Sequence, residues 1–468
     1  FHDVLPGSAI EAVYQQTDKN YAQLFTALSA TEEKFAATQL TPAVDRLVLY
    51  NPAGLAADLE TTIALPPDKT VQAAHGQPVR VQHLAGEQAL IQLPQAAPLA
   101  LQELQIVPGQ AASQPRQPEP LDGHYATDDL QITFDAAFNI VGLYDKQAQR
   151  EVLPAGGQFN RLMVYADYPR EYDAWNIDAD YRRQSWPVDH VVTAEVTDRG
   201  PIRDTLHIVR QFNQSTIEQW LHLYHGTTRI AFTTRLDWHE HHALLRTLFD
   251  VAVNAQHADF DIQFGNVSRP VARNTSWEQA QFEVAGQKWA DMSETDYGLS
   301  LLTDAKYGYS ATYQQLGLTL LKSATEPNPN ADQGIQKFTY EALLHQGSWR
   351  TAATMAAAQR LNIAPVIWPN YALPDTTPAA QSRLACNQQN VLLDTVKQAE
   401  DDDALIVRLY EYHNAQTTAT LTCARPVKSA MLCNLLEHDQ QPLTVSADGR
   451  QITVPFKPYE IQTIKLRF

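Results

Sequence analysis

Short runs of β-branched, aromatic and other apolar residues, separated by turn residues, fill almost the whole chain after residue 41. DTLHIVRQF, TIEQWLHLYH and RIAFTTRLDWHE are typical, with Gly, Asn, Asp or Pro falling between such runs. β-branched and aromatic side chains suit a pleated, half-buried surface, so this pattern is typical of strands. Because no helical segments alternate with the runs, the pattern favours antiparallel sheets over a parallel α/β architecture. The sequence therefore predicts a mainly β fold built from antiparallel sandwiches.

One long helix is predicted near the start of the chain, over residues 8–38. Apolar side chains recur there at spacings of three and four, from Ile10 to Leu28, which places them on one face of the helix. Ser8 and Glu11 have the spacing of a capping box and mark the helix start. We expect the apolar face of this helix to be buried.

The predicted strands fall into three β units, since a chain of 468 residues is too long for one core. Residues 46–108 predict a small sandwich, and the Pro- and Gln-rich residues 109–121 predict a linker. Residues 122–372 predict a large antiparallel sandwich, closed by the Pro-broken segment 364–378. Residues 373–468 predict a C-terminal β domain.

Charge and cysteine content exclude several classes of partner. The chain carries 53 acidic and 35 basic residues, a net charge of −18, which argues against nucleic acid and anionic membranes. No run approaches the roughly 18 apolar residues of a membrane span. The three cysteines form no CxxC pair and favour a reducing compartment, so we expect a cytoplasmic protein. The chain begins with Phe1 inside an apparent motif, so we expect its native start to be missing.

His2 and Asp3 form the first candidate site, immediately before the predicted helix. A neutral imidazole is a good zinc ligand, and a neighbouring carboxylate can accept a hydrogen bond from a sugar hydroxyl. One histidine cannot complete a metal site by itself. From residue types alone, a role in capping the turn is the favoured interpretation of the pair.

A second candidate lies around Trp175 and Asp173. Asn176, Asp178 and Asp180 place oxygen side chains at alternate positions, but the glycine and glutamate of an EF-hand are missing from the required positions. An indole ring beside carboxylates fits the edge of a sugar-binding site, but residue types alone favour a solvated loop anchored by tryptophan.

The dense imidazoles of His239-Glu240-His241-His242 do not form an HExxH motif, and we expect polar residues that face water at a strand end. No GxSxG, GxGxxG or Walker sequence is present. Nucleotide chemistry and a serine nucleophile are therefore not supported.

Several long motifs resemble the C-terminal half of the α-mannosidases of glycoside hydrolase family 38, in their bacterial and cytosolic form. FHDVLPGSAIEAVY resembles the motif in which His-Asp precedes a Pro-Gly-Ser/Thr turn, and VYADYPREYDAWNIDADY is similar to the family's DxPxxWDAWD segment. Further segments follow in the family's order, among them RLDWHEHHALLRTLFDV, PNPNADQGIQKFTYEAL and YEIQTIKL. The resemblance covers essentially the whole chain.

In that family a catalytic barrel precedes a helical bundle and several β-sandwiches, the largest of which resembles the galactose-mutarotase-like super-sandwich. The resemblance implies that residues 1–45 are a remnant of the bundle. It implies that His2 is the last zinc ligand in chain order and that Asp3 binds mannose hydroxyls beside this divalent metal. It also implies substrate-edge contacts from the large sandwich, here assigned to Asp173, Trp175 and Asp332.

The activity implied for the parent protein is retaining hydrolysis of terminal α-linked mannose from oligosaccharides, by two carboxylates about 5 Å apart. Both carboxylates belong to the barrel, so no catalytic residue is assigned in this chain, and we expect it to be inactive alone. The alternative is a stand-alone carbohydrate-binding or structural β-sandwich protein, with a mutarotase-like isomerase as a third hypothesis. The expected partners are a mannose-containing oligosaccharide and the catalytic barrel; a homo-oligomer stays open.

Overall fold

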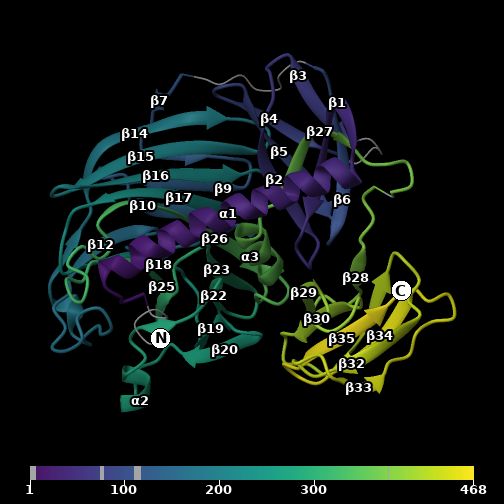
Figure 1. The fold of residues 1–468 in the computed structure, drawn as a ribbon. Helices are drawn as coiled ribbons and strands as arrows, with labels where there is room; N and C mark the ends of the chain where they lie inside the picture. The colour runs from purple at the N-terminus through teal and green to yellow at the C-terminus, as the bar shows by residue number, and fades with distance from the viewer. Residues whose placement is uncertain (1–6, 74–77, 110–116, 378) are drawn as a thin grey trace. The chain divides into compact units, whose positions relative to one another are not determined.

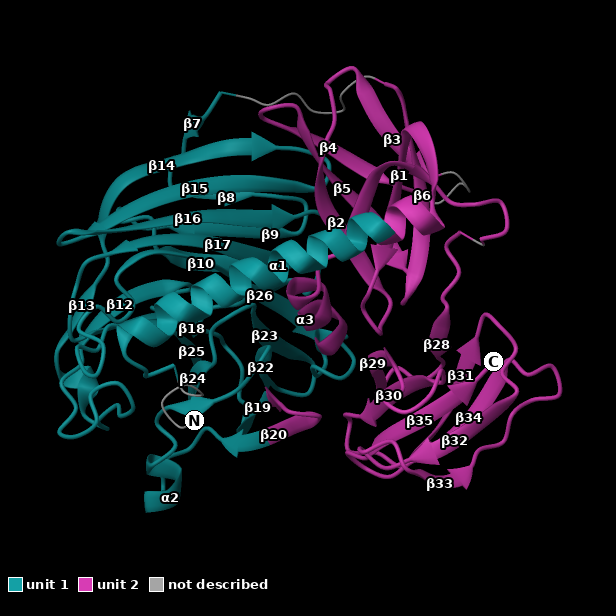
Figure 2. Cartoon of the chain, viewed as in Figure 1, with its two compact units in different colours: residues 1–34, 115–260, 268–354 teal, residues 35–114, 261–267, 355–468 magenta. Residues whose placement is uncertain are grey.

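The computed structural model describes residues 7–73, 78–109, 117–377 and 379–468, which are mostly strands (Figure 1). The predicted mainly β fold, with an N-terminal helix and several antiparallel sheets, is confirmed. The chain divides into two compact units (Figure 2). Unit 1 comprises residues 1–34, 115–260 and 268–354, and unit 2 comprises residues 35–114, 261–267 and 355–468.

A ten-stranded antiparallel sheet dominates unit 1. Burial alternates along its central strands, because one face turns to the core while the other carries polar side chains. In spatial order the sheet contains β20 (Gly265–Pro270), β19 (His257–Ile262), β22 (Trp289–Ser293), β23 (Tyr297–Thr303), β26 (Gly334–Gln346), β17 (Arg229–Trp238), β16 (Ser215–Tyr224), β15 (Arg203–Phe212), β14 (His190–Arg199) and β7 (Glu119–Pro120).

Two smaller sheets and two short helices complete the regular structure described in unit 1. The six-stranded sheet contains β13 (Ser185–Pro187), β12 (Arg161–Ala166), β18 (Ala243–Asp250), β25 (Gln315–Lys322), β24 (Gly308–Thr312) and β21 (Val284–Ala285). The four-stranded sheet contains β11 (Arg150–Glu151), β10 (Ile140–Asp145), β9 (Leu130–Phe134) and β8 (His124–Ala126), and the helices are η1 (Tyr181–Arg183) and α2 (Ser276–Gln279).

A cluster of aromatic rings joins the ten-stranded and six-stranded sheets. Phe232 of β17 and Tyr340 of β26 lie with their ring centroids 5.9 and 6.1 Å from that of Phe249 of β18. Phe159 approaches Phe249 edge-on at 4.8 Å. All four side chains are fully buried, so the two sheets share one core.

The helix α1 (Glu11–Gln39) forms as predicted, but its apolar face is not buried. Tyr21, Leu24, Phe25 and Leu28 are 49 to 62% exposed, and Ala36 is the buried residue of the helix. An amphipathic pattern shows that a helix has a face to cover but does not say which segment covers it. Within the described residues no segment covers this face, so the prediction of its burial is wrong for this chain. None of the described helices has the length and hydropathy needed to cross a bilayer.

Among its described residues, unit 2 contains four sheets and most of α3 (Thr354–Asn362). Two of the sheets bury a core that includes Leu49, Ile91 and Leu104, and the other two bury a core around Val407, Leu421 and Ile464. The first pair is β27 (Val366–Ala372), β1 (Thr41–Asn51), β6 (Ala100–Pro108) and β3 (Lys69–Ala73), with β2 (Ala57–Ala64), β5 (Gln88–Ala96) and β4 (Arg80–Leu84). The second pair is β28 (Leu384–Cys386), β31 (Thr417–Cys423) and β34 (Gln451–Phe456), with β29 (Val391–Gln398), β30 (Leu405–Glu411), β35 (Ile461–Arg467), β32 (Ser429–Cys433) and β33 (Asp439–Pro442).

The segment expected to close the large sandwich belongs elsewhere. Its strand β27 pairs antiparallel with β1, so it extends a sheet of unit 2. Trp368 of β27 is 9% exposed and packs in one cluster with Val48 and Leu101, with the ring of Phe35 at 5.1 Å. The sequence predicts a strand here but does not predict its partner strand. The partner depends on which apolar surface can pack against Trp368 in the folded protein.

Replacing Phe249 by Ala tests the shared core of the two sheets in unit 1. Removing this buried ring leaves a cavity, and we expect the free energy of unfolding to fall by about 3–5 kcal/mol, measured by urea denaturation. Tyr307→Ala, at a residue 53% exposed, is the control and should change the value by less than about 0.5 kcal/mol. Equal losses from both substitutions would contradict this description of the core.

Candidate functional site

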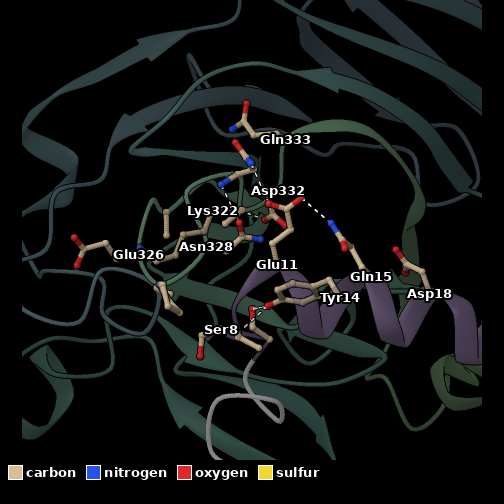
Figure 3. Close-up of a pocket in the computed structure, with 17 residues that line it drawn as sticks. Ser8, Glu11, Tyr14, Gln15, Asp18, Lys322, Glu326, Asn328, Asp332 and Gln333 are labelled. Atoms are coloured by element: carbon tan, nitrogen blue, oxygen red, sulfur yellow. Dashed lines mark hydrogen bonds between the residues drawn. The ribbon is translucent and has the colours of Figure 1, made fainter.

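A polar pocket of about 540 Å³ lies in unit 1, between the start of α1 and the segment that links β25 to β26 (Figure 3). Four carboxylates and four side-chain amides line it, with Lys322 as the basic residue among the lining residues. The lining carboxylates are Glu11, Asp18, Glu326 and Asp332, and the lining amides are Gln15, Asn328, Asn330 and Gln333.

Strand register brings the two loops of this site together. Ala166, at the end of β12, pairs with Ala243 of β18, and Leu244 of β18 pairs with Lys322, at the end of β25. The loops that leave β12 and β25 therefore emerge on either side of one strand. An ion pair between Lys322 and the buried Asp167 joins the two loops at their base.

The turn before α1 forms one wall of the pocket. Ser8 is 4% exposed, and the Tyr14 hydroxyl accepts a hydrogen bond from the Ala9 N–H at 3.1 Å while donating one to the carbonyl oxygen of Gly7. Glu11, at the first turn of the helix, accepts hydrogen bonds from Gln15 Nε2 at 3.1 Å and from Asn330 Nδ2 at 3.3 Å. The second of these bonds joins α1 to the opposite wall.

Trp175 connects the β12 loop to the turn before α1. Its indole Nε1–H donates to Ser8 Oγ, 167 residues away in the sequence. The loop itself is tight, because the Tyr172 carbonyl oxygen accepts from the N–H groups of Trp175 and Asn176 at 2.8 and 2.9 Å. The Trp175 ring lies beside that of Tyr172, with centroids 6.0 Å apart, and the residue is 48% exposed.

Asp173 connects the same loop to the segment after β25. Its Oδ2 atom accepts from the Thr325 N–H at 2.7 Å, the Thr325 hydroxyl at 3.2 Å and the Glu326 N–H at 3.2 Å. His242 Nδ1 lies 3.6 Å from Oδ1. Desolvation acts to raise the pKa of Asp173, but the hydrogen bonds from Thr325 and Glu326, with the attraction of His242, lower it overall. This carboxylate is thus held ionised against backbone N–H groups.

Asp332 lines the pocket in a left-handed backbone conformation, with φ of 57°. Its carboxylate accepts from the Lys322 N–H at 3.3 Å. Although the residue keeps contact with solvent, the surrounding protein desolvates its carboxyl group and raises its pKa, against the attraction of Lys306.

The structure places three of the five candidate residues around this one pocket. Asp332 lines it, Ala174 lines it between Asp173 and Trp175, and Trp175 bonds to Ser8 on its wall. His2 and Asp3 lie outside the described residues, which begin at Gly7. Sequence reasoning missed the contacts of Ser8 and Thr325, because no spacing in the chain marks a partner so far away.

No group of His, Cys, Asp and Glu side chains within the described ranges has the number and arrangement needed to hold a metal ion. The described residues alone therefore do not fit a zinc site. His239 contacts Asp237 at 2.9 Å and His241 is exposed, in accord with polar residues at a strand end. His242, expected to face water as well, is only partly exposed, because it contacts Asp173 and its ring stacks on that of Tyr168, with centroids 4.6 Å apart.

A second cluster lies on the ten-stranded sheet, where His207 sits between two carboxylates. Its Nδ1 is 3.2 Å from Glu195 and its Nε2 is 3.0 Å from Glu218, and its ring stacks on Trp220 at 5.0 Å. Both ring nitrogens are thus engaged within the protein. A mutarotase-like role would need an imidazole nitrogen that reaches a substrate, so this cluster does not support that hypothesis.

Two stretches of the chain match domains of known protein families. Residues 126–330 match the glycosyl hydrolases family 38 C-terminal domain, and residues 390–464 match the glycosyl hydrolases family 38 C-terminal beta sandwich domain. The first match contains Asp173 and Trp175 and ends just before Asp332.

Individual relatives extend the similarity along the chain. Alpha-mannosidase 2C1 of Homo sapiens is 30% identical over 100% of this chain and 44% of its own length, and Alpha-mannosidase G of Dictyostelium discoideum is 33% identical over 72% of this chain and 32% of its own length. The chain thus spans less than half the length of these relatives. A crystal structure of an alpha-mannosidase from Enterococcus faecalis V583 shares the fold, with a TM-score of 0.73 and 17% identity over 97% of this chain and 60% of that one.

Asp173→Asn tests the anchoring of the loop after β25. The folded protein holds the pKa of Asp173 below that of the unfolded chain, so its contribution to stability is full above about pH 4 and disappears as the pH falls below that value. We expect the substitution to lower the free energy of unfolding by about 2 kcal/mol at pH 7.

Urea denaturation of both proteins at pH 7 and pH 3 measures this difference, which should shrink at pH 3. Asp180→Asn is the control, because that carboxylate pairs with Arg183 at the surface, at 2.9 Å. It should change stability by less than about 0.5 kcal/mol at either pH. A difference for Asp173→Asn that does not depend on pH would contradict the anchoring role.

Proposed function

Since the chain belongs to glycoside hydrolase family 38, we propose that it is the C-terminal portion of a retaining α-mannosidase that removes terminal α-linked mannose from oligosaccharides. Both family domains and alpha-mannosidase relatives that cover the whole chain support this assignment. The nucleophile and the acid/base carboxylate belong, in this proposal, to an N-terminal catalytic barrel. The protein would act in the cytoplasm.

The lining of the 540 Å³ pocket is the observation that carries the proposal. Carboxylate and amide side chains offer acceptors and donors to a ligand rich in hydroxyl groups, and the half-exposed ring of Trp175, which bonds to the lining residue Ser8, adds apolar surface. Four carboxylates against Lys322, which is paired with Asp167, disfavour an anionic ligand. A neutral sugar suits this lining.

Within this proposal Asp173, Trp175 and Asp332 form the substrate edge. Asp3 would bind mannose hydroxyls, and His2 would supply one ligand to a divalent metal, zinc, whose other ligands come from the barrel. Such a metal supplies positive charge that binds and orients sugar hydroxyls.

The domain division proposed for the chain follows the same reasoning. Residues 1–45 would be a remnant of a helical bundle, residues 46–108 a small sandwich and residues 109–121 a linker. Residues 122–372, apart from β27, which pairs with β1, would form the large sandwich, and residues 373–468 would form the C-terminal β domain. The exposed apolar face of α1 supports the first of these, because an uncovered stripe of this size is typical of a helix that packs against further helices.

A stand-alone carbohydrate-binding protein is the second candidate function. It is favoured by the fact that residues of this chain line the polar pocket by themselves. Binding of mannose without hydrolysis by any longer product would distinguish it from the enzyme.

Hydrolysis of an aryl α-mannoside tests the proposed activity. The 468-residue chain and the longer product of the same reading frame should be assayed side by side, with zinc and then calcium added. We expect turnover only in the longer product, because the chain alone has neither catalytic carboxylate. Turnover by the 468-residue chain would mean that a second pair of carboxylates acts within the sandwiches.

Phe25→Glu tests whether the N-terminal part covers α1. Phe25 is 62% exposed in this chain, so the substitution should change its free energy of unfolding by less than about 0.5 kcal/mol. In the longer product the same side chain would be buried, and the loss should be about 3 kcal/mol by urea denaturation. Val44→Glu, at a residue 84% exposed, is the control in both proteins. Equal small effects of Phe25→Glu in both would contradict a covered helix.

A further inference from the structure

We propose that Trp175 is a positioning residue, whose indole N–H holds Ser8 and thereby fixes the turn through which the chain enters α1. The inference rests on the proposed function, because Asp3 and His2, which precede this turn, take their roles from it. In this proposal the role of Trp175 depends on its Nε1–H donor and not on the face of its ring.

Three segments around the pocket are connected to one another by hydrogen bonds, each segment to the other two. The Tyr172–Asn176 loop bonds to Ser8 through Trp175 and to Thr325 and Glu326 through Asp173. The segment after β25 bonds in turn to α1, through Asn330 and Glu11 at 3.3 Å. Three hydrogen-bonded segments restrict the turn more than a single contact would, because a movement of one segment also strains its hydrogen bonds to the other two.

Ser8 is well suited to receive this bond. It is 4% exposed, and Tyr14 fixes the backbone on either side of it by accepting from Ala9 and donating to Gly7. Asp3, to which the proposed function gives a role in binding mannose, precedes Ser8 by five residues in the sequence. Loss of the Trp175 contact would therefore loosen the turn before α1, which forms one wall of the pocket.

The geometry separates this role from sugar stacking. A stacking platform needs the ring face of Trp175, whereas the contact with Ser8 needs the Nε1–H donor. Trp175→Phe keeps an aromatic face and removes the donor, and Trp175→Leu removes both. Ser8→Ala removes the acceptor and leaves the indole in place.

Backbone hydrogen exchange in the 468-residue chain tests the contact without any enzymatic activity. We expect Trp175→Phe and Ser8→Ala each to speed exchange of the amides of residues 9–14 by about fivefold, and the double variant to speed it no further. Trp186→Phe is the matched control, since Trp186 is also 48% exposed and lies in β13, outside the pocket lining. Unchanged exchange in Trp175→Phe would overturn the proposal.

Kinetics of the longer product on an aryl α-mannoside test whether the contact serves the reaction. Poor placement of a group that acts in the transition state lowers kcat, so Trp175→Phe and Ser8→Ala should each lower kcat about tenfold and change KM less than twofold. An unchanged kcat beside faster exchange would overturn the positioning role in catalysis.

A raised KM in Trp175→Leu with wild-type values in Trp175→Phe would show that the residue stacks on the sugar, and would also overturn the positioning role. A wild-type longer product without mannosidase activity would overturn the proposed function. The exchange experiment would still show whether the hydrogen bond between Trp175 and Ser8 holds the turn.

Discussion

The antiparallel pairing of β18 with β12 on one side and β25 on the other is the constraint on which the pocket depends. β18 contributes Phe249 to the aromatic core that joins the six-stranded sheet to the ten-stranded one, so its position is fixed by burial of large apolar rings. Its register then sets where its two neighbours end. Because both loops of the site leave those ends, the core determines that they meet.

The polar contacts refine what the core has brought together. The Asp173 carboxylate accepts hydrogen bonds from backbone N–H groups after β25. These N–H groups lie beyond the end of the strand and so need an acceptor outside the sheet. Trp175 reaches the turn before α1, and Lys322 joins the loops through Asp167. These groups hold irregular loops on a rigid scaffold, which is the usual arrangement where binding residues must keep a fixed geometry. The same arrangement explains why a polar pocket can persist at a loop junction.

Local sequence pattern predicted the elements well and their partners poorly. The long helix and the β character of the rest follow from side-chain spacing, which reports interactions between near neighbours. Whether the α1 face is covered, the pairing of β27 with β1 and the contact of His242 with Asp173 each depend on residues far away in the chain. Residue type and resemblance predict that Asp173 and Trp175 bind sugar. Their bonds to Thr325 and Ser8 span 152 and 167 residues, and no spacing rule reaches so far.

By itself, the sequence determined the mainly β class, one N-terminal helix and membership of a glycosidase family, because strand alternation, helical period and long ordered motifs are all written along the chain. The tertiary structure alone decided that the loop after β12, the segment after β25 and the turn before α1 enclose one pocket. It also decided that the Asp173 carboxylate faces backbone N–H groups and that the Trp175 nitrogen faces Ser8. The reason is that sheet register, and with it the direction of every loop, is set by how the whole apolar core packs.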